Sequence, residues 1–141
     1  MRGVVLNLLI VTGLFAASGV AAQDANAPDG TMVFFDFGKS EIQRDYLAPL
    51  NAAATAVLSQ PGASVVVDGH SDRPGSSSSN RRASLRRAEA VRDYLVARGV
   101  AAQAITVTAS GEDRPLVATA DGVREPQNRR VDVRIVAQQK R

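Results

Sequence analysis

Hydrophobic and polar positions follow strand and helix spacings in turn from residue 31 onward. The β-branched and aromatic run at 31–37 ends at a turn, which predicts a buried strand. Apolar residues then recur at helical spacing up to a Pro-Gly pair, so we expect a helix that begins near residues 44–46. The continuous valines within 63–68 predict a second strand near the centre of a sheet. The apolar face of the helix would consist of Leu47, Leu50, Ala54, Val57 and Leu58.

A second helix is predicted after a serine-rich loop at residues 71–79. Asn80 is a suitable N-cap for it, and the helical pattern ends at Gly99. A third strand is predicted at 105–109. A last strand is predicted at 131–135, where apolar and charged residues alternate as they do in a strand with one face in water. The buried stripe of the second helix would consist of Ser84, Ala88, Val91 and Leu95.

The order of these elements is β-α-β-α-β-β. It predicts an α/β fold in which both helices pack on one sheet within a single domain. A long connection at 111–129 precedes the last strand. We expect this connection to hold a short helical turn after Pro115 or to form a mobile surface loop.

The first 22 residues have a different pattern. Arg2 is followed by an apolar stretch at 3–15 and by small residues up to Ala22, which is typical of a secretory signal peptide with its cleavage site. The stretch is shorter than the roughly 20 residues that a membrane anchor needs, so export with cleavage is favoured over a retained anchor. We therefore expect a signal peptide at 1–22 and a flexible leader at 23–30. The mature domain at 31–141 is expected to have no transmembrane segment.

Composition narrows the chemistry that this domain can perform. With 141 residues, of which 45% are hydrophobic, the chain can form one domain with a substantial core. The sequence has no cysteine, which excludes disulfides, thiolate metal sites, a cysteine nucleophile and a cysteine-linked lipid anchor. The net charge of +3 falls to +2 when Arg2 leaves with the signal peptide, and this is too small to favour nucleic acid as a partner.

The most polar segment, Asp68-Gly69-His70-Ser71-Asp72, lies where the central strand is predicted to end. In open α/β sheets, ligands commonly bind at such strand ends. A metal site built from Asp68, His70 and Asp72 is disfavoured because the sequence contains only one histidine. A hydrolase that uses Ser71 and His70 is disfavoured because the segment lacks a GxSxG nucleophile elbow. No cofactor is indicated.

Asp72 and Arg87 offer a third possibility. Arg87 follows Asp72 by 15 residues, about two turns into the second predicted helix. If that helix runs back beside the strand, a carboxylate and a guanidinium face one crevice and can bind the ammonium and carboxylate groups of a zwitterion. The alternatives are that Asp72 caps a turn while Arg87 is a solvated helix charge, or that the two side chains pair with each other.

Several residues of this segment and of the helix after it follow a characteristic spacing. They are Gly69-His70-Ser71-Asp72, Gly75, Asn80, Ser84, Arg87-Ala88 and Val91. Together they resemble the peptidoglycan-binding signature of OmpA-like C-terminal domains. Residues 33–42 resemble the first strand and turn of that family. The C-terminal part of the family's pattern is resembled by Gly111-Glu112, Pro115 and residues 127–131. The resemblance covers nearly all of the mature chain and implies an α+β sandwich, β-α-β-α-β-β, with two helices packed on one mixed sheet.

The resemblance also implies a binding protein without enzymatic activity. Its ligand would be the diaminopimelate residue in the peptide stem of peptidoglycan, which has a zwitterionic end. Asp72 would bind the ammonium group and Arg87 the carboxylate, with Asn80 assisting near the start of the helix. Such a protein would reside in the periplasm and anchor or stabilise the cell envelope. The alternative is an adaptor in an envelope protein complex, with a degenerate pocket.

Three further residues match ligand-contacting positions of the family. Gly38 and Phe37 fall in its first loop, and Arg129 falls in its Asn-Arg-Arg segment. Phe37 is equally a candidate for the core, and Arg129 equally a brace for the sheet edge.

The chain departs from the family pattern around the predicted pocket. Ser71 replaces a threonine, which keeps a hydroxyl group. Ala83 stands where leucine is usual, and we expect the smaller side chain to loosen helix packing by about 2 kcal/mol. The serines at 76–79 are expected to make the pocket rim more flexible than it is in other members of the family. These departures predict a change in affinity rather than in function.

Overall fold

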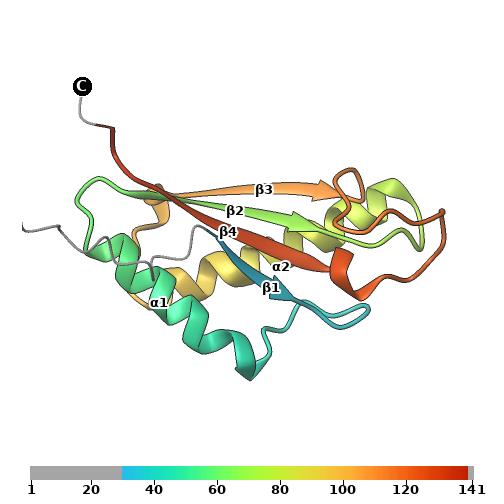
Figure 1. Cartoon of the computed structure of the whole chain (residues 1–141), viewed down its shortest axis with the longest axis horizontal. Coiled ribbons are helices and arrows are strands. Elements are labelled where there is room, and N and C mark those ends of the chain that lie inside the picture. Colours follow the sequence, from blue (N-terminus) through green and yellow to red (C-terminus); the bar gives the residue numbers. More distant parts are fainter. Residues whose placement is uncertain (1–29, 140–141) are drawn as a thin grey trace, which may run out of the picture.

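The computed structural model describes residues 30–139, which form a sheet and two long helices (Figure 1). The predicted signal peptide at 1–22 and nearly all of the leader at 23–30 lie outside the described residues. Within 30–139, none of the helices has the length and apolar character needed to span a membrane. The helices are α1 (Leu47–Leu58) and α2 (Ser77–Ala97), and the strands are β1 (Thr31–Phe34), β2 (Ser64–His70), β3 (Ile105–Gly111) and β4 (Arg130–Val136).

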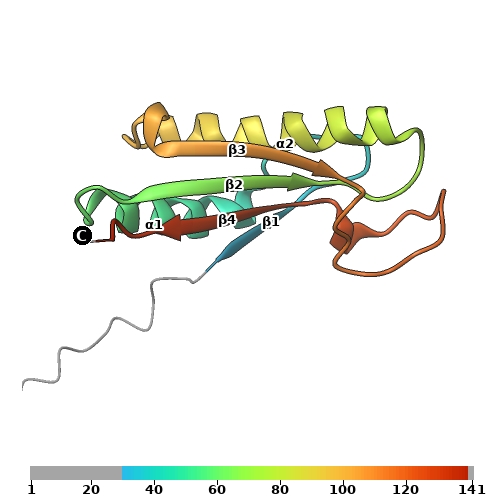
Figure 2. The same ribbon diagram turned by 90° about the horizontal axis from the view of Figure 1, so that it is seen from above.

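The sheet is mixed, and its strand order is β1-β4-β2-β3. β2 pairs in parallel with β3 and antiparallel with β4, and β4 also pairs antiparallel with β1. Seen from above, the strands lie in front of both helices, so α1 and α2 cover the same face of the sheet (Figure 2). The predicted element order, the fold class and the interior position of the second strand are therefore confirmed.

The hydrophobic core lies between the sheet and the two helices. Val67 on β2 and Val133 on β4 are cross-strand partners, and both are almost fully buried in one cluster with Leu50 from α1 and Leu95 from α2. Each such side chain contributes about 1.5–3 kcal/mol when it is buried. The alternating strand residues between these valines point to the opposite face of the sheet.

Helix α2 packs directly against the backbone of β2. The contact occurs at Gly69, where a Cβ atom would overlap the carbonyl oxygen of Ser84. The absence of a side chain at Gly69 therefore lets the helix approach the strand. Arg87 lies three residues after Ser84, so this close approach also brings Arg87 beside the end of β2.

The first strand and first helix differ slightly from the prediction. β1 ends at Phe34 rather than at Phe37, because the chain turns at Asp36, whose carbonyl oxygen accepts a hydrogen bond from the Lys39 N–H at 3.1 Å. Leu58, predicted on the apolar face of α1, is 57% exposed. Successive helix residues point about 100° apart around the helix axis. Val57 is buried in the core, so Leu58, the last residue of α1, points away from it.

Helix α2 begins earlier than predicted. Its N-cap is Ser76, whose hydroxyl oxygen accepts a hydrogen bond from the Ser79 N–H at 3.2 Å, so the prediction of Asn80 as the N-cap is wrong. Serine is among the preferred N-cap residues, and the first one of the serine run ends the loop. The serines at 77–79 consequently form the first turn of α2 and are not part of a loop.

The long connection before β4 is organised by Asn128, which is fully buried. Its Oδ1 accepts hydrogen bonds from the N–H groups of Leu116 and Val117 at 2.8 and 2.9 Å, and its Nδ2 donates to the Val117 carbonyl at 2.7 Å. The connection does hold a helical turn, but at Pro126–Asn128, further along than the predicted position after Pro115.

Candidate functional site

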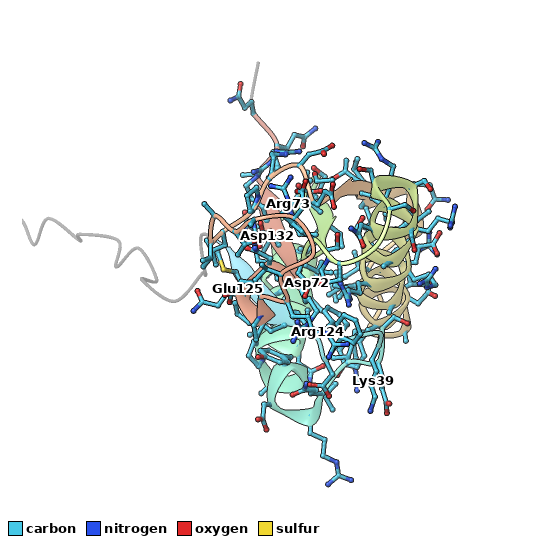
Figure 3. All side chains as sticks on the ribbon, turned by 90° about the vertical axis from the view of Figure 1, so that its right-hand side faces the viewer. Lys39, Asp72, Arg73, Arg124, Glu125 and Asp132 are labelled. Atoms are coloured by element: carbon cyan, nitrogen blue, oxygen red, sulfur yellow. The ribbon has the colours of Figure 1, made fainter. Side chains whose placement is uncertain are left out.

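A pocket of about 180 Å³ lies where β1 and β2 end and α2 begins. Figure 3 looks at this end of the molecule, where Asp72, Arg124 and Lys39 come from three different segments of the chain. The pocket brings together five of the six predicted site residues, Phe37, Gly38, Asp72, Asn80 and Arg87. Its other lining residues are Ser71, Pro74, Ser79, Ala83 and Arg86.

Asp72 is only 4% exposed, and its two carboxylate oxygens have different surroundings. Oδ2 accepts hydrogen bonds from Nη1 of Arg129 at 2.8 Å and from the backbone N–H of Glu125 at 3.1 Å. Oδ1 accepts no hydrogen bond from any of residues 30–139. A carboxylate oxygen can accept more than one hydrogen bond, so Oδ1 is available to a cationic group of a ligand.

Arg87 is 3% exposed, so the alternative of a solvated helix charge is wrong. Its guanidinium donates hydrogen bonds to three backbone carbonyl oxygens, those of Lys39 at 3.0 Å, His70 at 3.3 Å and Asp36 at 3.5 Å. These bonds tie the helix to the ends of β1 and β2 and fix the orientation of the guanidinium.

No carboxylate among residues 30–139 forms an ion pair with Arg87. Asp72 pairs with Arg129 instead, so the alternative that Asp72 and Arg87 pair with each other is also wrong. Burial lowers the pKa of Arg87 to about 10, while the nearby charge of Asp72 acts in the opposite direction. Arg87 is therefore a buried cation at neutral pH, and a bound anion would compensate its charge.

Asn80 lies in the first turns of α2 and is 6% exposed. Its Nδ2 donates a hydrogen bond to Oε2 of Glu112 at 2.6 Å, and Oε1 of the same carboxylate accepts one from the Ser77 hydroxyl at 2.9 Å. Glu112 thereby fixes the Asn80 amide and leaves its Oδ1 without a hydrogen-bond partner among residues 30–139. The predicted role of Asn80 beside a ligand stays a prediction, whereas its predicted role as N-cap is wrong.

Phe37 forms the rim of the pocket and is 44% exposed. The core position belongs to Phe35, which is 3% exposed, so the alternative that Phe37 is a core residue is wrong. The guanidinium of Arg124 stacks 3.7 Å from the centroid of the Phe37 ring, which holds the ring beside the connection before β4. Gly38 adopts φ of +70°, which favours glycine in the turn that places Phe37.

Arg129 does not line the 180 Å³ pocket. Its Nε donates to the Phe35 carbonyl at 3.0 Å while its Nη1 binds Asp72, so it braces the end of β1 against the β2–α2 loop. It also lines a neighbouring cavity of about 420 Å³ beside β1. Arg129 consequently positions the Asp72 carboxylate and faces an adjoining cavity.

Two pocket residues, Ser71 and Ala83, have surroundings that the sequence did not indicate. The hydroxyl of Ser71 is buried and has no hydrogen-bond partner among residues 30–139. Ala83 is half-buried on the pocket wall and lies outside the core cluster, so it is not at the core position on which the expected loosening of helix packing rests. A leucine at this position would reduce the room for a ligand, because the side chain faces the pocket and not the core.

The position of His70 speaks against the two enzymatic arrangements considered above. Its Nε2 lies 3.2 Å from Asp68 and 3.1 Å from Asp132, in a different cavity from the one that Ser71 and Asp72 line. Ser71 therefore has no imidazole base in its own pocket. Within the described part of the chain, no group of three or more side chains suited to metal binding is found.

The chain is similar to known proteins over most of its length. The profile of the OmpA family matches residues 34–129. A peptidoglycan-associated lipoprotein of Pasteurella multocida (strain Pm70) is 36% identical over 112 residues, which make up 79% of this chain and 74% of that protein. Another, from Rhizobium meliloti (strain 1021), is 33% identical over 118 residues, or 84% of this chain and 67% of that protein.

The fold has a solved counterpart in the crystal structure of the peptidoglycan-associated lipoprotein from Burkholderia pseudomallei. The two structures agree with a TM-score of 0.70 and 31% sequence identity, over 74% of this chain and 89% of that chain. This similarity covers both helices and the mixed sheet.

Proposed function

Because the chain belongs to the OmpA family, we propose that it binds peptidoglycan non-covalently and thereby anchors or stabilises the cell envelope. Relatives at 36% and 33% identity are named peptidoglycan-associated lipoproteins. The observation that carries the proposal is the buried guanidinium of Arg87, which has no carboxylate partner among residues 30–139 and lies in one pocket with a free oxygen of Asp72.

The chemistry of this pocket fits the free end of a diaminopimelate residue. A guanidinium binds a carboxylate with charge-assisted hydrogen bonds, and a carboxylate oxygen accepts them from an ammonium group. Arg87 would bind the ligand carboxylate and Oδ1 of Asp72 its ammonium group. The free Oδ1 of Asn80 and the unpartnered hydroxyl of Ser71 add polar contacts at the same pocket.

We propose that the protein is a binding module and catalyses no reaction. Its hydroxyl and imidazole candidates, Ser71 and His70, line different cavities, so they do not support acyl transfer. Export directed by the predicted signal peptide at 1–22, followed by its cleavage, would deliver the module to the periplasm, where peptidoglycan is accessible. We also propose envelope proteins as additional partners of such a module.

A pull-down with purified sacculi tests the proposal. We expect the wild-type chain to sediment with sacculi, whereas Arg87→Met and Asp72→Asn remain in the supernatant and keep the wild-type circular-dichroism spectrum. Arg82→Met is a suitable control, because Arg82 is an exposed arginine of the same helix that does not line the pocket. Full sedimentation of both pocket variants would refute the proposal.

An NMR titration with free diaminopimelate separates the binding module from an adaptor with a degenerate pocket. Peptidoglycan binding predicts saturable shifts in the backbone signals of Gly38 and Ser71, two residues of the pocket. An adaptor predicts no such shifts. Release of soluble fragments from sacculi incubated with the chain would contradict the absence of catalysis.

A further inference from the structure

A second polar cavity lies on the face of the sheet that points away from α1 and α2. Its volume is about 300 Å³, and it shares no lining residue with the pocket around Arg87. The side chains come from positions that alternate with the core valines on β2 and β4 and from the connection after β3. We call this cavity the sheet-face pocket, and its charged residues are Asp68, His70, Arg114, Arg130, Asp132 and Arg134.

The acceptors of the sheet-face pocket are already occupied. Asp68 accepts hydrogen bonds from the hydroxyl groups of Thr108 at 2.7 Å and Ser110 at 2.9 Å, and Arg114 lies 3.4 Å away. Asp132 lies opposite Asp68 in the β2–β4 register and accepts a hydrogen bond from Nε of Arg130 at 3.0 Å.

His70 lies between these two carboxylates. Its Nε2 is 3.2 Å from Asp68 and 3.1 Å from Asp132, and the residue is 2% exposed. The imidazole therefore fills the space between two like charges that directly oppose each other, a pairing that is otherwise destabilising. Both aspartates are thus engaged by the protein itself.

Donors, in contrast, are in excess. Arg130 is 5% exposed, and its Nη1 is buried without a hydrogen-bond partner among residues 30–139. Nδ1 and Nε2 of His70 are also buried without a hydrogen-bond partner among these residues, although Nε2 lies close to the two aspartates. Arg134 is exposed, and its side chain makes no hydrogen bond or ion pair with any of the described residues. A buried guanidinium nitrogen without an acceptor is costly, so this cavity favours a ligand that supplies acceptors.

The charge of the cavity fits a monoanion. Three arginines against two aspartates leave one excess positive charge when His70 is neutral. A dianion such as inorganic phosphate would be repelled by the two aspartates, whereas a carboxylate carries one charge and matches the planar fork of a guanidinium. Val66 also lines the cavity and offers an apolar surface to the carbon chain of an organic acid.

We propose that the sheet-face pocket binds an organic carboxylate through Arg130 and Arg134. The carboxylate is either an acidic side chain of another protein or a small organic acid, since both present the same group. The pocket is separate from the one assigned to peptidoglycan, so the chain can hold both ligands at once, one at the ends of β1 and β2 and the other on the face of the sheet away from the helices.

His70 makes the proposal easy to test, because it is the only histidine of the chain and lines this cavity. The full chain is titrated at low ionic strength with the monocarboxylate butyrate, with the peptide acetyl-Gly-Glu-Gly-amide, with its Gln analogue and with inorganic phosphate, while the imidazole NMR signals are followed. We expect saturable shifts with one or both carboxylates and none with the Gln peptide or phosphate. Tighter binding of the peptide identifies a protein segment as the source, and tighter binding of butyrate identifies a small acid.

Arg134→Gln is the variant of choice, because Arg134 is exposed and its removal breaks no contact, whereas Arg130 is buried and bonded within the fold. Loss of one charge-assisted contact is expected to weaken carboxylate binding about five- to tenfold. Arg82→Gln removes an equal charge from the exposed face of α2 and should leave the affinity unchanged. The proposal is overturned if no carboxylate gives saturable shifts, if phosphate or the Gln peptide binds equally well, or if Arg134→Gln binds as the wild type does.

Discussion

Replacing Arg87 by methionine is expected to abolish ligand binding with little effect on the stability of the free protein. Methionine retains much of the length of the arginine side chain but removes the charge. The free energy of unfolding then changes by two opposing contributions, because Arg87 both bonds to the fold and places a charge in its interior.

The favourable contribution comes from three hydrogen bonds to backbone carbonyls at 3.0, 3.3 and 3.5 Å. At about 1 kcal/mol each, they stabilise the fold by about 3 kcal/mol. The unfavourable contribution is the burial of the charge, which lowers the pKa of Arg87 from its ordinary value to about 10. That difference corresponds to about 3 kcal/mol, so the two contributions nearly cancel. We expect Arg87→Met to change the free energy of unfolding by less than about 2 kcal/mol.

The effect on binding has no such cancellation. A bidentate pair between a guanidinium and a ligand carboxylate contributes about 3 kcal/mol, so its loss weakens binding about 100-fold or more. Urea denaturation measures the stability, and the sacculus pull-down measures the affinity. A loss of more than about 4 kcal/mol in stability would show that the guanidinium is mainly a structural group. Unchanged binding would refute its role as the anion receptor.

Further substitutions examine other parts of the structure. Gly69→Ala should destabilise the fold by about 3 kcal/mol and abolish sacculus binding, because its methyl group would displace α2 at Ser84; an unchanged melting temperature would contradict the close approach. Ala83→Leu introduces the residue that is usual in the family at this position, so it should retain diaminopimelate binding; it should also leave stability unchanged, because position 83 faces the pocket and not the core, and a gain in stability would argue for a core role. Burial alone would raise the pKa of Asp132, but contacts with His70 and Arg130 outweigh it and hold the pKa below its ordinary value of 3.8. Asp132 therefore stabilises the fold above pH 3.8 and loses this contribution as the pH falls through the lower folded-state value, so Asp132→Asn should lose less stability than the wild type between pH 7 and acid pH in urea titrations.

The sequence predicted the fold well because its patterns are local and strong. Periodicity identified β2 as an interior strand and identified the buried stripe of α2, both of which depend on side-chain spacing alone. The starts and ends of elements were less accurate. Ser76, and not Asn80, caps α2, because a run of serines offers several equivalent caps and only tertiary packing selects one of them.

The shared pocket of the candidate site residues was predicted, but most of the contacts that they make were not. Sequence spacing placed Asp72 and Arg87 at one pocket, and the structure agrees. Their actual bonds run to Arg129 and to three backbone carbonyls, which become neighbours only when β1, β2 and the connection before β4 meet. No local pattern encodes such contacts between segments far apart in the sequence.

The pairing of Asp72 with Arg129 makes the two halves of the pocket unequal. Oδ2 of Asp72 is held at 2.8 Å by a buried guanidinium, so much of the carboxylate charge is already balanced before a ligand arrives. Arg87 has no such partner among residues 30–139, and its charge is balanced only in part, by carbonyl dipoles and by the nearby charge of Asp72. Electrostatic attraction in the pocket is therefore stronger for the carboxylate of a zwitterion than for its ammonium group. Because the position of Asp72 is fixed, it would determine which carboxylate ligands the pocket binds. Only a ligand whose donor group lies at the correct distance from its carboxylate would also bind Oδ1 of Asp72. In the proposed complex, Arg87 would supply most of the affinity, and the pair of Asp72 and Arg129 would supply the selectivity.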